Sequence, residues 1–148
     1  FAAVTSPLTI QKPLHKTHLA SYREILIGGT KYKELASQIR SLNDLSGIPV
    51  IGLADGTGTR ELYHRYFLSH GLMFAPDMEA ATTDQILPMI THNLGIGFYP
   101  EELAAEAIAR GSAYAIRLVE PIPEREICLV TNSSTQMSAA VRKVISFL

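Results

Sequence analysis

The stretch Leu94-Gly95-Ile96-Gly97-Phe98-Tyr99-Pro100-Glu101-Glu102-Leu103 decides the fold class of this chain. Its first half predicts a short apolar strand, whose two glycines allow another backbone segment to approach closely. Pro100 is expected at the first position of a helix, and the two glutamates after it fall in the first turn, where the helix macrodipole favours carboxylates. A strand that runs directly into a helix is typical of an α/β sheet.

The same alternation of strands and helices extends to both sides of this stretch. Short apolar runs predict strands over residues 1–5, 21–27, 48–53, 78–81, 113–119 and 126–131. Apolar residues at helical spacing predict helices after Gly58-Thr59, over residues 100–110, and from about residue 135 to the end. A further helix is expected after Thr82, which forms a capping box with Gln85, although Pro88 should kink this helix or delay its start.

Composition excludes several classes of protein. Of the 148 residues, 47% are hydrophobic and 18% are charged, which predicts a soluble, well-packed globule. No apolar run is long enough to cross a bilayer, no signal peptide is visible, and a formal net charge of −1 gives no general reason to bind nucleic acid. The single cysteine, Cys128, excludes an internal disulfide and is expected to be a buried thiol, which fits a reducing, cytoplasmic compartment.

A polar corner separates one predicted strand from the clearest helix. The segment Asp55-Gly56-Thr57-Gly58-Thr59-Arg60 offers the hydroxyls of Thr57 and Thr59 and backbone N–H groups at a positive helix end. Such a corner suits a carboxylate or another small anion. The alternative is that Thr59 or Gly58 only caps the helix. The segment completes neither a P-loop nor a dinucleotide fingerprint, so nucleotide binding is not expected.

Two further polar turns are candidates for ligand contact. Thr82-Thr83 forms a second corner between a strand and a helix, and it would open at the same sheet edge as the first corner if the two strands are parallel. Thr5-Ser6, followed by Pro7, forms a third turn, which is either a crossing between lobes or a surface turn. Capping alone remains an alternative for Thr82 and Thr83.

The sequence contains no recognisable catalytic, metal or cofactor site. The five histidines are scattered, and His15 and His18 have no further ligand at metal-binding spacing. No nucleophile elbow appears, and Cys128 has no histidine beside it in the sequence. The expectation is a protein that binds a small molecule without catalysing a reaction.

Taken in order along nearly the whole chain, several segments resemble the effector-binding (substrate-binding) domain of LysR-type bacterial transcriptional regulators. The most diagnostic is the strand-to-helix stretch at residues 94–100. The other matching segments are residues 1–8, 13–19, 22–27, 42–45, 49–51, 59–60, 67, 71–72, 125–130 and 137–141. Two residues depart from the family pattern, namely Pro88 in the preceding helix and Asn93, where the family often has a small residue.

The resemblance implies two Rossmann-like lobes of the type 2 periplasmic-binding-protein fold, with a small effector in the cleft between them. Residues 7–123 would form most of the second lobe, and residues 1–6 and 124–148 would supply crossing strands and part of the first lobe. The family pattern implies that Thr5, Ser6, Thr82 and Thr83 contact the effector, with Thr57 and Thr59 a less certain match.

The resemblance also implies partners. The chain opens at Phe1 as if within a strand, so we expect it to be a fragment whose N-terminal helix-turn-helix domain, the only part that binds DNA, lies elsewhere. A homodimer or homotetramer in the cytoplasm, with no cofactor and no membrane contact, is expected. The alternatives are a solute-binding receptor or an enzyme on the same bilobal fold, and a free-standing α/β enzyme such as a hydrolase.

Overall fold

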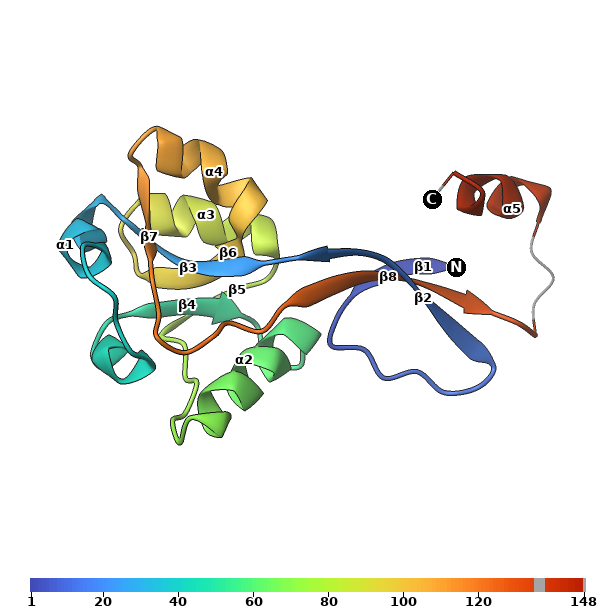
Figure 1. The fold of residues 1–148 in the computed structure, drawn as a ribbon, viewed down its shortest axis with the longest axis horizontal. Coiled ribbons are helices and arrows are strands. Elements are labelled where there is room, and N and C mark those ends of the chain that lie inside the picture. The colour runs from blue at the N-terminus through green and yellow to red at the C-terminus, as the bar shows by residue number, and fades with distance from the viewer. Residues whose placement is uncertain (135–137, 148) are drawn as a thin grey trace. The chain divides into compact units, whose positions relative to one another are not determined.

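The computed structural model describes residues 1–134 and 138–147 and divides the chain into two compact units (Figure 1). The first unit combines Phe1–Tyr22 with Arg125–Leu148, and the second is Arg23–Glu124. The second unit is therefore one continuous segment inserted between the two segments of the first. The predicted second lobe began at residue 7, and the structure instead groups residues 7–22 with the first unit.

The second unit is built on a five-stranded mixed sheet with the order β5-β4-β6-β3-β7. Strand β4 is parallel to β5 and β6, whereas β3 is antiparallel to β6 and β7. The strands are β3 (Glu24–Gly29), β4 (Val50–Leu53), β5 (Met78–Ala80), β6 (Ile96–Pro100) and β7 (Ala113–Ile116). The helical segments are η1 (Thr30–Tyr32), α1 (Lys33–Ala36), η2 (Leu42–Leu45), α2 (Gly58–Ser69), α3 (Thr83–Thr91) and α4 (Glu101–Ala109).

Helices cover both faces of this sheet, so its central strands are apolar on both faces. Figure 1 shows α3 and α4 on one side of the sheet and α2 on the other. In β3, Leu26 belongs to the core under α2, and its neighbour Ile27 belongs to the core under α3 and α4. Both side chains are 0% exposed, because successive residues of a strand point to opposite faces. The predicted α/β class is confirmed.

The strand-to-helix stretch around β6 has the close packing that its glycines predicted. A Cβ on Gly95 would lie 2.6 Å from the carbonyl oxygen of Pro49, and a Cβ on Gly97 would lie 3.3 Å from the Ile90 side chain on α3. The prediction for Pro100 is wrong by one position. Pro100 has an extended ψ of 127° and pairs with Glu24 as the last residue of β6, so the helix begins at Glu101.

Helix α3 runs through Pro88 and begins at Thr83, so the proline does not delay its start. Pro88 lacks only the N–H that would reach Asp84, and the carbonyl of Pro88 still accepts a hydrogen bond from His92 N at 3.1 Å. The helix ends at Thr91 with His92 as its cap, and the next residue, Asn93, has a φ of 62° in the left-handed region.

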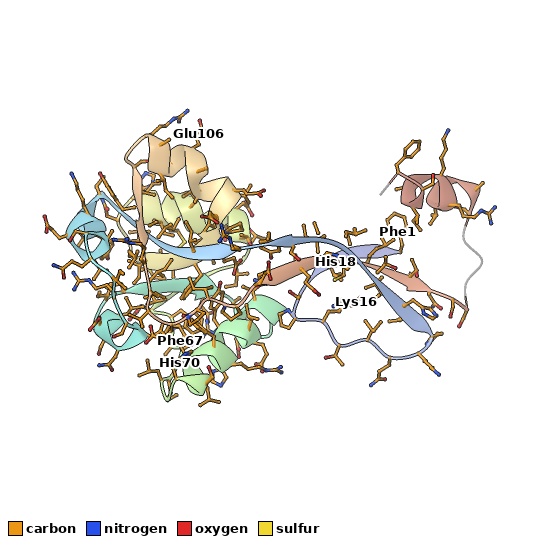
Figure 2. The ribbon with its side chains drawn as sticks, in the orientation of Figure 1. Phe1, Lys16, His18, Phe67, His70 and Glu106 are labelled. Atoms are coloured by element: carbon orange, nitrogen blue, oxygen red, sulfur yellow. The ribbon has the colours of Figure 1, made fainter. Side chains whose placement is uncertain are left out.

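The first unit contains a three-stranded antiparallel sheet with the order β1-β8-β2 and one helix. Its elements are β1 (Ala2–Thr5), β2 (Leu14–Tyr22), β8 (Arg125–Asn132) and α5 (Ala139–Ile145). Figure 2 shows Lys16 and His18 on β2, most of whose side chains are exposed. The sequence did not predict the first part of β2, because this segment lacks an alternation of apolar and polar residues. Residues 14–22 belong to this unit because β2 pairs with β8. The terminal helix was predicted from about residue 135, and residues 135–137 and 148 lie outside the described residues.

Cys128 in β8 is 0% exposed, as predicted for a structural thiol. Its neighbour on the same strand, Glu126, forms an ion pair with Lys16 at 2.7 Å. The hydrogen bond between the two lowers the pKa of Glu126 and raises the pKa of Lys16. The pair therefore joins the start of β8 to β2 by a charge contact at the surface of this sheet.

Candidate functional site

The two polar corners of the second unit lie at the same edge of its sheet. Strands β4 and β5 are parallel, and Leu53 is paired with Ala80 at their carboxyl ends. The N–H of Ala54 donates to the carbonyl of Ala80 at 3.0 Å, which extends the pairing by one residue. The sequence left open whether these two strands are parallel, and the structure shows that they are. The starts of α2 and α3 consequently follow neighbouring strands, where ligand sites of α/β sheets usually form.

Thr57 is the cap of α2, in place of the predicted Thr59 or Gly58. Its backbone is extended, with φ −82° and ψ 148°, and its Oγ1 accepts a hydrogen bond from Arg60 N at 3.2 Å. The same hydroxyl donates to the carbonyl of Ala54 at 3.0 Å. Because its one proton is already engaged, Thr57 holds the corner in shape and has no donor left for an anion.

Arg60 is the charged residue that sequence reasoning missed at this corner. Its guanidinium donates from Nη1 to the carbonyl of Leu53 at 3.0 Å and to Glu79 Oε1 at 3.3 Å. The guanidinium also lies 5.4 Å from the centre of the Phe74 ring. The hydrogen bond from Arg60 to the last carbonyl of β4 depends on tertiary contacts that helical periodicity does not report.

Thr59 lines a very small hollow beneath Arg60. The cavity measures about 10 Å³ and is also lined by Tyr63 and Phe98. A space of this size holds at most about one water molecule. The first corner of the second unit therefore provides no room for an effector beneath Thr59.

The second corner, at Thr82 and Thr83, is open. Thr82 is the cap residue of α3 and is exposed, and Thr83 is the first helical residue and is half-buried. Among the described residues, neither hydroxyl has a hydrogen-bond partner. The predicted capping box is only partly correct, since Gln85 Oε1 accepts from the N–H of Ala81 at 2.8 Å and the Thr82 side chain does not cap. This corner therefore offers two hydroxyls and the first N–H groups of a nine-residue helix.

Negative charge accompanies these donors. Asp84 lies in the first turn of α3 and is exposed. Burial, with a smaller contribution from the negative charge of Asp84, raises the pKa of Tyr99 on β6. An anion at this corner must therefore approach the hydroxyls and N–H groups from the side away from Asp84.

Thr5 and Ser6 belong to the first unit, where a buried arginine holds them. Arg125 is 1% exposed, and its Nε donates to the carbonyl of Ser6 at 2.7 Å. Its Nη2 donates to Thr5 Oγ1 at 3.3 Å, and its guanidinium lies 5.6 Å from the centre of the Tyr22 ring. Ser6 Oγ also accepts from the N–H of Glu126 at 2.8 Å. The turn is thus fixed by its own unit, and within the described residues neither the Thr5 nor the Ser6 hydroxyl donates a hydrogen bond.

A buried carboxylate lies at the same edge of the second sheet, at the start of the antiparallel strand β3. Glu24 is 6% exposed and accepts a hydrogen bond from the hydroxyl of Tyr63. The Tyr63 ring stacks on Phe98 at 4.1 Å between centroids. Tyr63 is one of the apolar residues at helical spacing that predicted α2, but nothing in the sequence indicated that Glu24 is buried.

Within the described residues, no group of three or more histidine, cysteine, aspartate or glutamate side chains could hold a metal ion. Among those same residues, no helix has both the length and the apolar character needed to cross a membrane.

The chain is similar to known transcriptional regulators. The sequence model of the LysR substrate binding domain matches residues 2–148. The uncharacterized HTH-type transcriptional regulator YeiE of Escherichia coli (strain K12) is 24% identical over 142 residues, which cover 93% of this chain and 48% of that protein. The chain thus spans about half the length of this relative.

Two solved structures share the fold. The effector binding domain of QuiR in complex with shikimate has a TM-score of 0.80 at 16% identity, covering 99% of this chain and 69% of that one. The regulatory domain of CcmR from Synechocystis PCC6803, in complex with 2-PG, also has a TM-score of 0.80, at 17% identity, covering 98% of this chain and 69% of that one. The matches confirm the predicted type 2 periplasmic-binding-protein-like fold.

Proposed function

Because this chain belongs to the LysR substrate binding domain family, we propose that it is the ligand-sensing regulatory domain of a LysR-type bacterial transcriptional regulator. Its ligand is a small anion, and the response to that ligand modulates DNA binding and transcription. No covalent bond is made or broken in this function. The relatives described above are transcriptional regulators and effector-binding domains, not enzymes.

The observation that carries this proposal is the open corner at the start of α3. In the part of the chain that the structure describes, the hydroxyls of Thr82 and Thr83 have no hydrogen-bond partner, and they lie next to the N–H groups of the first turn. The positive end of the helix macrodipole favours an anion at this place, by about 0.3–1 kcal/mol near the surface. Thr5 and Ser6, whose turn accepts hydrogen bonds from Arg125, are proposed as effector contacts on the family pattern alone.

The remaining sequence-predicted residues have different roles in this proposal. Thr57 shapes the corner as a helix cap, and Thr59 contacts the effector at most from the margin, because the hollow that it lines is too small for a ligand. QuiR and CcmR are solved with shikimate and with 2-PG, which supports a small-molecule effector for this chain as well.

We further propose that the regulator works in the cytoplasm as a homodimer or homotetramer. Its DNA contacts come from a helix-turn-helix domain outside this chain. The formal net charge of −1 supports a DNA-binding site outside this chain, because the chain has no excess of positive charge that would bind DNA phosphates. A ligand that binds one arrangement of the protein better than another shifts the balance between them.

Calorimetric titration of small carboxylates, beginning with shikimate, tests the effector site. We expect Thr83→Ala and Ser6→Ala each to weaken the binding of an active carboxylate roughly tenfold, the effect of losing one hydrogen bond to a charged group. Thr57→Ala should lower the melting temperature, through a loss of about 1 kcal/mol of helix capping, while leaving the affinity nearly unchanged.

Thr91→Ala is the matched control, because Thr91 lies at the other end of α3 and its hydroxyl donates to the carbonyl of Pro88. This variant should bind as the parent does. Equal affinity of the parent, Thr83→Ala and Ser6→Ala would show that the effector site has been assigned to the wrong residues.

A further inference from the structure

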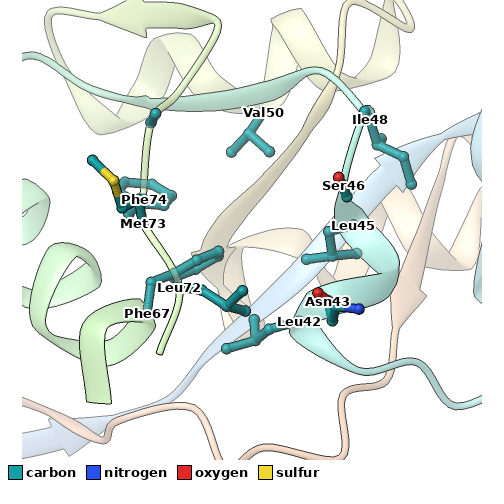
Figure 3. A pocket seen from close by; sticks show the side chains of 12 residues that line it. Leu42, Asn43, Leu45, Ser46, Ile48, Val50, Phe67, Leu72, Met73 and Phe74 are labelled. Carbon is teal, nitrogen blue, oxygen red and sulfur yellow. The ribbon is translucent and has the colours of Figure 1, made fainter. Parts of the chain in front are cut away.

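A second cavity lies in the second unit, at the opposite end of β4 from the polar corners. Its volume is about 220 Å³, and Val50, the first residue of β4, is in its wall. Figure 3 shows η2 on one side of the cavity and the end of α2 with the segment after it on the other. Its apolar lining consists mainly of Leu42, Leu45, Val50, Phe67, Leu72 and Phe74.

The lining contains aromatic rings and no charge. The rings of Phe67 and Phe74 are 4.9 Å apart between centroids and are inclined at 49°. Such a tilted pair can accept a third ring in an offset or edge-to-face contact. None of the described residues that line the cavity is a lysine, arginine, histidine, aspartate or glutamate. An ion would lose its hydration there without gaining a partner, so a charged ligand is disfavoured.

Two polar side chains of the lining have unused hydrogen-bonding capacity. Asn43 lies in η2, and Ser46 is the residue that ends it. Within the described part of the chain, neither side chain makes a hydrogen bond. The neighbouring Met73, also part of the lining, is 80% exposed. An amide, a hydroxyl and a flexible thioether therefore accompany an aromatic and aliphatic interior, a combination found in small-molecule sites.

We infer that this cavity is a second ligand site, which binds a neutral compound built on one aromatic ring that carries an amide or hydroxyl group. The size fits such a ligand, because an engineered protein cavity of about 150 Å³ is known to bind benzene. The ring lies against Phe67 and Phe74, and its polar group exchanges hydrogen bonds with Asn43 or Ser46. The ligand differs in charge from the proposed anionic effector, and this inference does not depend on that effector.

Benzamide and benzoate provide the test, since they share one ring and nearly one shape but differ in charge. The full chain, labelled with ¹³C at the methionine methyl groups, is titrated with each compound and followed by NMR. Benzamide should shift the Met73 methyl signal saturably, with a Kd between about 10 µM and 5 mM, while the signal of Met89 on α3 stays in place. Benzoate should bind at least about tenfold more weakly.

Filling the cavity should abolish the response. Ala75 is exposed and contributes to the lining, so Ala75→Phe should remove the Met73 shift. Ala105→Phe, on the exposed face of α4, is the matched control and should leave the shift unchanged. Ser46→Phe provides a second blocking variant if Ala75→Phe does not fold, and the melting temperature of every variant is measured first.

A polar variant separates hydrogen bonding from simple insertion of a ring. Asn43→Ala should weaken benzamide three- to tenfold and leave toluene unaffected. The inference is overturned if benzamide gives no saturable shift at Met73 up to about 10 mM, if benzoate binds as well as benzamide, or if a folded blocking variant responds as the parent does.

Discussion

At the residue scale, single side chains decide the geometry of the turns. Asn93 departs from the small residue that the family often has, and its φ of 62° explains why: the position needs the left-handed conformation, which glycine and asparagine tolerate best. Its N–H donates to the carbonyl of Ile90 at 2.8 Å, and its Oδ1 accepts from the N–H of Lys31 at 2.9 Å. One asparagine thus ends α3 and fixes the start of η1.

Arg125 should be the arginine whose loss costs most stability. It is 1% exposed and donates to Ser6 and Thr5, so Arg125→Gln removes a buried guanidinium together with these hydrogen bonds and should lower the free energy of unfolding by about 2–4 kcal/mol. Urea denaturation measures the change. Arg110→Gln is the control: Arg110 is 73% exposed in an ion pair with Glu106, and its loss should cost less than about 0.5 kcal/mol. Similar losses for both variants would contradict this account.

At the element scale, contacts at helix ends and close approaches between backbone segments determine where elements begin and how closely they pack. The carboxylate of Asp44 accepts a hydrogen bond from the N–H of Ser41 at 2.7 Å at the start of η2. This hydrogen bond lowers the pKa of the Asp44 carboxyl. At Gly95 the backbone carbonyl of Pro49 approaches so closely that there is no room for a Cβ.

The stability contributed by Asp44 should depend on pH. Since its pKa is lower in the folded state than in the unfolded chain, its contribution is complete above the unfolded pKa, near 3.9, and is lost as the pH falls through the lower folded value. Asp44→Asn should therefore have a lower melting temperature than the parent at pH 7, and the difference should shrink in acid below the folded pKa. A difference that stays constant down to about pH 2 would rule out this linkage.

Gly95→Ala should destabilise the sheet more than Gly97→Ala. The added methyl at Gly95 meets backbone at 2.6 Å, whereas at Gly97 the nearest atom, the carbonyl oxygen of Ile51, is 3.1 Å away. Overpacking against backbone should cost about 1–3 kcal/mol at Gly95 and less at Gly97. Thermal unfolding of both variants gives the comparison, and the reverse order would show that the neighbouring strand moves freely.

At the scale of the whole molecule, the two hydrophobic cores of the sheet both belong to Arg23–Glu124. Strand β3 is central to this unit, because it pairs with β6 on one side and β7 on the other. The proposed division into lobes therefore has a physical test, which is whether this segment folds by itself.

The excised segment 23–124 should unfold cooperatively in urea, because it keeps every strand of its sheet and both cores. A segment starting at residue 50 is the control: it lacks β3, separates β6 from β7, and should remain unfolded. Urea unfolding is followed by circular dichroism and by tyrosine fluorescence, and coincident transitions would show that the segment unfolds cooperatively. A gradual, non-cooperative transition of segment 23–124 would contradict its autonomy.

The sequence by itself determined the α/β class, the position of the polar corners and most of the alternation of strands and helices, because apolar periodicity and turn residues act over a few neighbouring positions. The one strand predicted over residues 21–27 is instead the end of β2 followed by β3, which belong to different sheets. The glycines at Gly95 and Gly97 also had the role that the sequence predicted. Only the tertiary structure decided that the Thr57 hydroxyl caps its helix while the Thr82 hydroxyl does not, that Arg125 is buried, and that β2 lies along β8. These outcomes depend on which atoms the register of the sheet brings within hydrogen-bonding distance, often from residues more than a hundred positions apart, as in Arg125 with Ser6.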